Sequence, residues 1–429
     1  MAELVNPVLA LFGGLLLVLS LTSGLIKNRW FISEPTVALA FGVLIGPQVA
    51  GFVNHSSTQE ELITFLDHLA RITLVIALLD VATDLPRDYL WRQRRALTIM
   101  IFLVMPLMWL TSSLLAGLIL GLPLLVCLAI GAIVTPTDPV IAHSVVSGKI
   151  ARKSIPTRTR ELILAESGAN DALAHPIVML PVLLLIHPDQ AWSDWFINIL
   201  LWDVIGGAAL GALAGALAGK LLTRVRKSEA SDEASLLTVS VTLSLTILGA
   251  LKLAGSDGLL AAFAAGLVYN QFVAKEFQES REHVHAALRR LFELPAFIVL
   301  GIVLPWEEWW SRGWPIWLFA IAVVLFRRLP AVLLFCRWIE PLKSRSESLL
   351  VGWFGPIGIA ALLYATIVFK KTGMENAWIV GSMVIMVSTV IHGVSATPLT
   401  RIFGRNHSHS PASPAEEDAS REPAENQNR

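Results

Sequence analysis

The stretch that decides the fold is LPLLVCLAIGAIVTPTDP, residues 122–139. It is apolar up to its last five residues, where Asp138 stands between Pro136 and Pro139. Proline has no amide hydrogen, so the two prolines interrupt the hydrogen-bond ladder of a helix and free backbone carbonyls. Inside a membrane, such an interruption is tolerated only within protein or beside a water-filled cavity. The stretch therefore predicts a membrane-spanning helix that is broken at a carboxylate.

The composition indicates a chain that crosses a membrane many times. Of its 429 residues, 55% are hydrophobic and only 15% are charged, whereas soluble domains carry about 25% charged residues. Runs such as 96–123 and 198–218 hold hardly a charge and are long enough to span a bilayer. The 33 basic and 33 acidic residues balance, so net charge indicates no nucleic-acid partner. Cys127 and Cys336 lie in apolar runs, which argues against a disulfide framework or a metal cluster.

The sequence thus predicts an all-α polytopic membrane protein embedded in a lipid bilayer. Breaks at charged or Pro/Gly-rich segments divide residues 1–403 into thirteen predicted spans. Their limits are 5–26, 34–50, 61–84, 96–121, 122–147, 159–186, 193–219, 234–252, 256–274, 291–306, 314–336, 347–369 and 376–400. Residues 404–429 contain no aromatic residue and no Leu, Ile, Val or Met, so they are predicted to be a disordered cytoplasmic tail.

Basic residues predict the orientation, because Lys and Arg collect in cytoplasmic loops. One alternate set of loops and loop edges holds 22 of them, and the other set holds only Lys252, Arg312, Lys370 and Lys371. The N-terminus is therefore predicted outside, and the C-terminus inside, the inner or plasma membrane of the cell. Thirteen spans also divide into six, one linker and six, which suits two inverted repeats. Span 12, the counterpart of span 5, is interrupted at Gly355 and Pro356.

A second polar motif, ESGAND at 166–171, lies in predicted span 6. Helical spacing places Glu166 over Asn170 and Ser167 over Asp171. An ionised group at the bilayer centre costs about 2.5–3.5 kcal/mol or more, so such a group indicates function by default. The alternatives are a pair that fixes helix packing, or, for Asp138, a proline kink with a solvated carboxylate.

Asp138 and Asp171 fall near the middles of neighbouring antiparallel spans, so they are expected at one depth. Carbonyls freed at the break and the Thr137 hydroxyl are hard oxygen ligands, and the ends of the half-helices orient an ion. Desolvation and a second carboxylate both favour the protonated form of a carboxyl group. The two motifs therefore predict one site that takes either a proton or a monovalent cation.

Two arginines, Arg327 and Arg328, also lie inside a predicted span. A buried, ionised Glu166 needs a partner, and we expect one of them to supply it. Adjacent helical positions point about 100° apart, so only one should face the site. Arg71 is expected in a separate structural pair. His175, four residues after Asp171, is either a tuning residue or a packing histidine, and with no third ligand at metal spacing no transition-metal site is predicted.

These motifs resemble the CPA1 type of monovalent cation/proton antiporters, over about residues 10–400. The motifs TDP at 137–139 and ESGAND at 166–171 carry the resemblance. FRRLP at 326–330 and GWFGPIG at 352–358 are most similar to the fungal-type sodium/proton exchangers and their bacterial relatives. The chain departs from many members at Ile357, where they carry Arg or Lys, and at Ala172, where they carry Gly.

The resemblance implies a homodimer that works by alternating access. It implies a core bundle (about 96–186 and 314–400), dimerisation or scaffold helices (about 5–84 and 193–306), and broken crossing helices at spans 5 and 12. The ions would be protons exchanged for sodium, lithium or potassium, with no cofactor. Asp171 and Asp138 would be the ion carboxylates, Thr137 and Ser167 would add oxygens, and Arg327 rather than Arg328 would hold Glu166 and Asn170.

Two other functions use the same polar residues. A cation channel or leak pathway would need an uninterrupted polar lining or a carbonyl filter, and the sequence contains no such filter. An intramembrane aspartyl hydrolase could use Asp138 and Asp171 as a dyad. The flanking prolines and the lack of a nucleophile constellation count against an enzyme.

Overall fold

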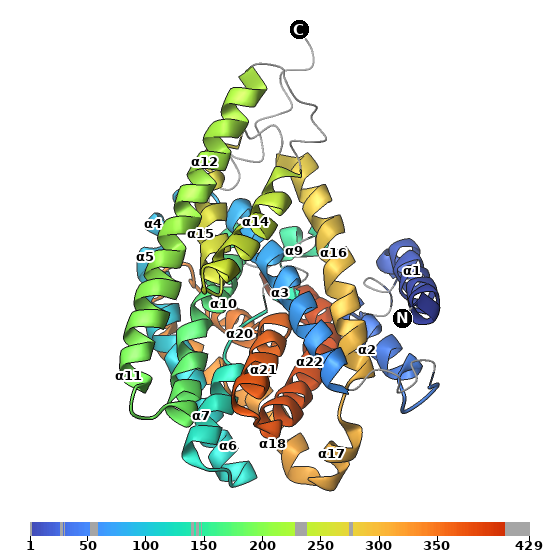
Figure 1. Cartoon of the computed structure of the whole chain (residues 1–429). Helices are drawn as coiled ribbons and strands as arrows, with labels where there is room; N and C mark the ends of the chain where they lie inside the picture. Colours follow the sequence, from blue (N-terminus) through green and yellow to red (C-terminus); the bar gives the residue numbers. More distant parts are fainter. Residues whose placement is uncertain are drawn as a thin grey trace.

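The computed structural model describes residues 2–25, 29, 31–51, 59–138, 141–142, 146, 148–227, 238–273 and 278–407. These residues form helices and connecting segments with no strand, so the predicted all-α class is confirmed for the described part of the chain. Figure 1 shows a helical bundle with α1 at one side and α10, α21 and α22 near its middle.

The first half of the chain forms helices that range from a single turn to about eight turns. Its elements are α1 (Ala2–Leu25), α2 (Glu34–Ile45), α3 (Gln59–Asp84), α4 (Tyr89–Arg92), α5 (Arg94–Ile99), a π-helical turn (Met100–Val104), α6 (Met105–Leu120), α7 (Leu124–Ile133), α9 (Gly148–Ser154), α10 (Thr157–Ile186), α11 (Ala191–Asp194), a π-helical segment (Trp195–Gly206) and α12 (Gly207–Lys227).

The second half of the chain also combines long helices with short ones. Its elements are α14 (Val239–Leu253), α15 (Leu259–Tyr269), α16 (Gln278–Ile302), α17 (Trp306–Ser311), α18 (Trp314–Phe326), α19 (Leu329–Phe335), a 3-10 turn (Cys336–Trp338), α20 (Arg345–Trp353), α21 (Ile359–Thr372) and α22 (Glu375–His407). Helix α22 runs past residue 403 to His407, and the rest of the predicted tail lies outside the described residues.

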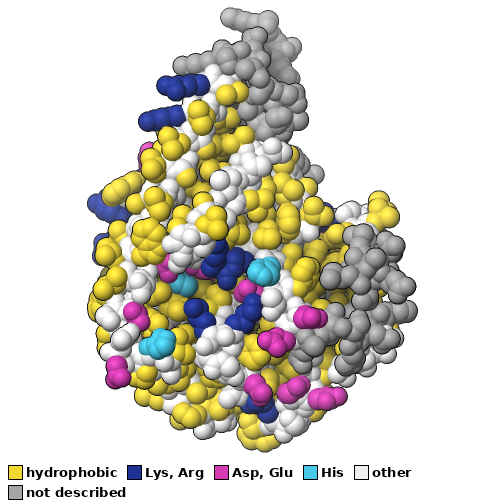
Figure 2. All heavy atoms as spheres, viewed as in Figure 1, with side chains coloured by type: hydrophobic (Ala, Val, Ile, Leu, Met, Phe, Trp, Pro, Cys, Tyr) yellow, Lys and Arg dark blue, Asp and Glu magenta, His cyan; other side chains and the backbone are white. Residues whose placement is uncertain are grey.

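Within the described residues, six helical runs are long and apolar enough to cross a membrane: Glu60–Asp84, Arg94–Leu120, Thr157–Ile186, Ala191–Val225, Trp314–Trp338 and Glu375–Arg405. Five shorter apolar helices in the same residues overlap other predicted spans. Figure 2 shows a mainly hydrophobic exterior in this view, as a lipid-facing surface requires. The chain is therefore a multi-pass membrane protein. The count of thirteen crossings and the inverted repeats stay predictions.

The two interruptions predicted from proline and glycine are present and meet each other. Helix α7 ends at Ile133, and α21 begins only at Ile359 after a non-helical segment at 354–358. The amide of Asp138 donates to the Pro356 carbonyl at 2.8 Å, so the broken segments are hydrogen-bonded to one another. Pro139 lies outside the described residues.

The span predicted at 314–336 corresponds to the apolar run Trp314–Trp338, but its helix is interrupted, because α18 ends at Phe326 and α19 begins at Leu329. Pro330 lies in the first turn of α19. Its ring clashes with the carbonyl four residues earlier, at Phe326, and it donates no hydrogen bond. The break therefore falls at Arg327 and Arg328, the two residues that carry the charges.

Candidate functional site

Asp138 joins the two broken segments through its side chain as well as its backbone. The carboxylate is fully buried, and its Oδ2 atom accepts from the Ile359 amide at 2.6 Å while Oδ1 accepts from Ile141 at 3.2 Å. Helix N-termini carry a partial positive charge, so Asp138 is stabilised at the start of α21. A Cβ atom at Gly358 would lie 1.8 Å from Oδ2, which explains the glycine there. Asp138 is thus held in a fixed position between the two breaks.

Arg327 satisfies the carbonyls that the breaks set free. Its guanidinium is buried and donates to the carbonyls of Val134, Thr135, Pro136 and Gly355, with 3.1 Å to Thr135 and to Pro136. Each carbonyl oxygen has two lone pairs, so these bonds leave some acceptor capacity, but they place a positive charge beside it. That the freed carbonyls serve as cation ligands stays a prediction.

Glu166 has an arginine partner, as predicted, but the partner is Arg328 and not Arg327. The two guanidinium nitrogens of Arg328 donate to the two carboxylate oxygens of Glu166, each at 2.8 Å. Asn170 donates to Glu166 Oε1 at 3.0 Å, and Arg328 Nε donates to the Val351 carbonyl at 3.0 Å. This bidentate geometry is the strongest form of an Arg–carboxylate contact.

Both arginines face the interior, and each is only 2% exposed. The expectation that one must point away assumed a continuous helix with 100° between neighbours. The interruption between α18 and α19 removes that constraint. Arg327 therefore reaches the two breaks while Arg328 reaches α10.

Neither oxygen of the Asp171 carboxylate has a hydrogen-bond partner, although the residue is fully buried. The Thr137 hydroxyl and the Asn170 amide oxygen are also buried without partners. The Ser167 hydroxyl donates to the Thr137 carbonyl at 2.5 Å, which ties α10 to the break. Tyr364 donates to the backbone carbonyl of Asp171 at 3.2 Å.

Four buried oxygen atoms on Asp171, Thr137 and Asn170 are thus left without partners. Burying such groups unsatisfied costs about 1–3 kcal/mol each and more for a charged group. Carboxylate, hydroxyl and amide oxygens are ligands that hard cations prefer. The arrangement is therefore suited to bind a proton or a hard cation.

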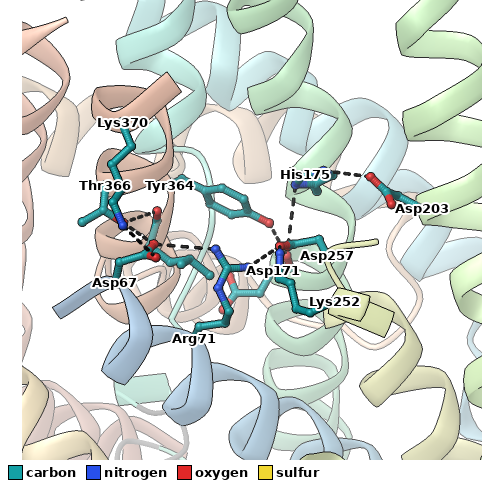
Figure 3. Close-up of polar contacts among 11 residues, drawn as sticks. Asp67, Arg71, Asp171, His175, Asp203, Lys252, Asp257, Tyr364, Thr366 and Lys370 are labelled. Carbon is teal, nitrogen blue, oxygen red and sulfur yellow. Dashed lines mark hydrogen bonds and ion pairs between the residues drawn. The ribbon is translucent and has the colours of Figure 1, made fainter. Parts of the chain in front are cut away.

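A second polar network lies beside this site (Figure 3). Arg71 pairs with Asp257 and, at 3.6 Å, with Asp67. Lys252 also bonds Asp257, at 2.8 Å, and His175 Nε2 lies 3.2 Å from Asp203 Oδ2. The pairing of Arg71 with Asp67 matches the expected structural pair. Nothing in the sequence indicated that His175 joins Asp203 and Asp257 in this network.

Asp80 belongs to a third cluster, formed by α3, α14 and α16. Its carboxylate bonds His285 Nδ1 and Arg289, and His285 Nε2 lies 2.5 Å from the Ser240 hydroxyl. Asp80, His285 and Arg289 are all buried. The paired groups fix helix packing, which is the structural alternative for an intramembrane charge.

Hydrophobic helices, two broken segments that bond each other and a buried carboxylate without partners are together features of ion-transporting membrane proteins. Residues 14–402 match the family described as "Sodium/hydrogen exchanger, transmembrane". The chain therefore belongs to the sodium/hydrogen exchanger family.

Among its relatives, a probable Na(+)/H(+) antiporter of Schizosaccharomyces pombe is 33% identical over 420 residues, which are 90% of this chain and 55% of that protein. The Na(+)/H(+) antiporter of Saccharomyces cerevisiae is 32% identical over 360 residues, 81% of this chain and 36% of that protein. The chain thus spans about half or less of these fungal proteins. The sodium proton antiporter MjNhaP1 from Methanocaldococcus jannaschii shares the fold, with a TM-score of 0.64 at 19% identity over 94% of this chain and 97% of that one.

Proposed function

We propose that this chain is a secondary antiporter that exchanges protons for a monovalent cation, sodium, lithium or potassium, at Asp171. The observation that carries the proposal is the complete burial of an Asp171 carboxylate whose two oxygens have no partner. A buried, ionised carboxylate without partners has a high free energy, and binding a proton or a cation lowers that free energy. Because the same oxygens serve both ligands, binding of one excludes the other, and one site couples the two opposite fluxes.

Each neighbour of Asp171 has a defined part in this proposal. The Thr137 hydroxyl and the Asn170 amide oxygen complete the cation ligands, since both are unpartnered. Ser167 holds the Thr137 carbonyl in place through its 2.5 Å hydrogen bond. Asp138 adds negative charge and fixes the two broken segments relative to each other. No cofactor takes part.

Family membership and the basic-residue pattern support further proposals about the whole protein. We propose that it works as a homodimer by alternating access, with its N-terminus outside and its C-terminus inside the inner or plasma membrane. The curated relatives carry names that state Na(+)/H(+) antiport, which favours sodium among the candidate cations.

The test is cation-driven proton movement in proteoliposomes that contain the purified protein. Asp171→Asn should abolish exchange, because an amide takes up no proton. Asp189→Asn, the same chemical change at an exposed residue near the end of α10, should exchange at the wild-type rate. The wild-type exchange rate should pass through a maximum as pH is varied, since protons compete with the cation at low pH and are scarce at high pH. Wild-type exchange by Asp171→Asn would sink the proposal, and proton flux without any cation gradient would favour a leak.

A further inference from the structure

His175 lies on α10 four residues after Asp171, one helical turn and about 6 Å along the axis. Tyr364 connects the two, because its hydroxyl bonds the Asp171 carbonyl and its ring centroid lies 6.4 Å from that of His175. Figure 3 shows both residues in one group with Asp203 and Asp257. His175 therefore lies one helical turn from Asp171 on the same helix, with Tyr364 packed near both residues.

The ring nitrogens of His175 face two carboxylates. Nε2 lies 3.2 Å from Asp203 Oδ2, and Nδ1 lies 3.7 Å from Asp257 Oδ2, beyond hydrogen-bond distance. His175 Nδ1, Asp203 Oδ1 and Asp257 Oδ2 are all buried without a hydrogen-bond partner. The group around His175 thus contains three buried polar atoms whose hydrogen-bonding capacity is not used.

His285 shows what a packing histidine looks like in this protein. Its two nitrogens are both engaged, by Asp80 and by Ser240, and the residue is 2% exposed. His175 differs on both counts, since one nitrogen is unpartnered and its side chain is 12% exposed. The difference argues against a purely structural part for His175.

The charged and polar groups around His175 come from several other elements of the bundle. Asp203 comes from the π-helical segment 195–206, Asp257 from the α14–α15 connection and Tyr364 from α21. Arg71 of α3 and Lys252 of α14 both bond Asp257 Oδ1, so the charge of Asp257 is largely compensated. Asp203, by contrast, has His175 as its partner among the described contacts. Of the two carboxylates, Asp203 therefore has the less compensated charge and faces the imidazole directly.

This polar group is not completely buried. The Lys252 side chain is 41% exposed, and those of His175 and Asp203 are 12% and 11% exposed. Figure 2 shows basic, acidic and histidine side chains near the middle of this face, with further acidic side chains toward its lower edge. In the predicted orientation this group lies between Asp171 and the outer surface, because α10 runs outward from Asp171.

We propose that His175 relays protons between Asp171 and the outer side of the membrane, an inference that rests on the proposed function. The N–H bond of the imidazolium breaks as an O–H bond forms on the Asp171 carboxylate, directly or through one water. The neutral imidazole then takes a proton from solvent by way of Asp203. Release to the outside runs through the same bonds in reverse. Tyr364 is a positioning residue in this relay.

The test varies pH on one side of the proteoliposome membrane while the other side is fixed, for the wild type and for His175→Gln. The variant should exchange about tenfold more slowly or worse. The exchange rate of His175→Gln should no longer depend on the pH of the outer side, while its dependence on the pH of the other side should remain. Imidazole added on that side should restore several-fold activity to His175→Ala. Thermal stabilisation by sodium should persist, because the cation ligands are intact. His187→Gln, at an exposed histidine after α10, should match the wild type.

Wild-type rate and pH dependence in His175→Gln would overturn the relay, as would an equal loss on both sides without rescue by imidazole. If His175→Gln does not fold, Asp203→Asn takes its place, and an unchanged pH curve in that variant overturns the relay. The two proposals fail separately. Exchange by Asp171→Asn removes the proposed function, whereas inactive Asp171→Asn together with wild-type behaviour of His175→Gln removes the relay alone.

Discussion

Replacing Arg328 by Met should destabilise the protein by about 3 kcal/mol, because Glu166 would remain as a buried charge without its main partner. Both side chains are nearly inaccessible, at 2% and 1% exposure, and they share two contacts of 2.8 Å. Breaking a buried pair costs about 3–5 kcal/mol. The lower end applies because Asn170 still donates to Glu166. Met preserves the volume of the aliphatic stem, so the loss reports the charge and not a cavity.

A double-mutant cycle isolates this interaction. Arg328→Met with Glu166→Gln removes both charges of the pair and leaves neither one unpaired. The loss of stability in the double variant should therefore be smaller than the sum of the two single losses, by about 2 kcal/mol or more. Unfolding in mixed detergent micelles, followed by the fluorescence of the 14 tryptophans, measures each variant. Arg327→Met with Glu166→Gln should couple more weakly, because the hydrogen bonds of Arg327 go to carbonyls. Stronger coupling of Glu166 with Arg327, or none with Arg328, would refute the assignment.

Three further changes test the site and its surroundings. Gly358→Ala places a Cβ 1.8 Å from Asp138 Oδ2, so exchange in proteoliposomes should fall more than tenfold, whereas Gly13→Ala, with open space around it, should have no effect. Thr137→Val removes an unpartnered oxygen and should raise the cation KM several-fold at an unchanged melting temperature; an unchanged KM contradicts its part as ligand. Burial, and after it Glu161, raises the pKa of Tyr89, between α3 and α5, well above its ordinary value. Stability should therefore fall as pH rises through about 10, where the unfolded phenol ionises, and Tyr89→Phe should lack this loss in alkaline melting curves.

Local chemistry made the helix breaks predictable. Pro136 lacks an amide hydrogen whatever its surroundings, and the Gly355-Pro356 pair acts in the same way, so the interruptions at 134–138 and 354–358 follow from the sequence. Pro330 carried the same signal for the break at Arg327 and Arg328. That signal was missed because the apolar run around it was long enough to be one span.

The partners of the charged groups could not be predicted in the same way, because they come from distant parts of the chain. Arg327 and Val134 are 193 positions apart, and Arg328 and Glu166 are 162 apart. Which guanidinium meets which acceptor depends on helix positions that spacing does not encode. The contacts of His175 with the 195–206 segment and the α14–α15 connection have the same origin.

The two arginines together explain why Asp171 stays free at the centre of the bundle. A guanidinium placed this close to a carboxylate would ordinarily pair with it, yet Arg328 is committed to Glu166 and Arg327 to four backbone carbonyls. A hydrogen bond to a charged group is worth about 1.5–3 kcal/mol, so turning Arg327 toward Asp171 would sacrifice several such bonds and strand carbonyls in an apolar interior. The helix breaks thus have a second consequence. The free carbonyls bind the Arg327 guanidinium, so that Arg327 forms no ion pair with Asp171. The Asp171 carboxylate therefore remains available to a ligand that binds and dissociates.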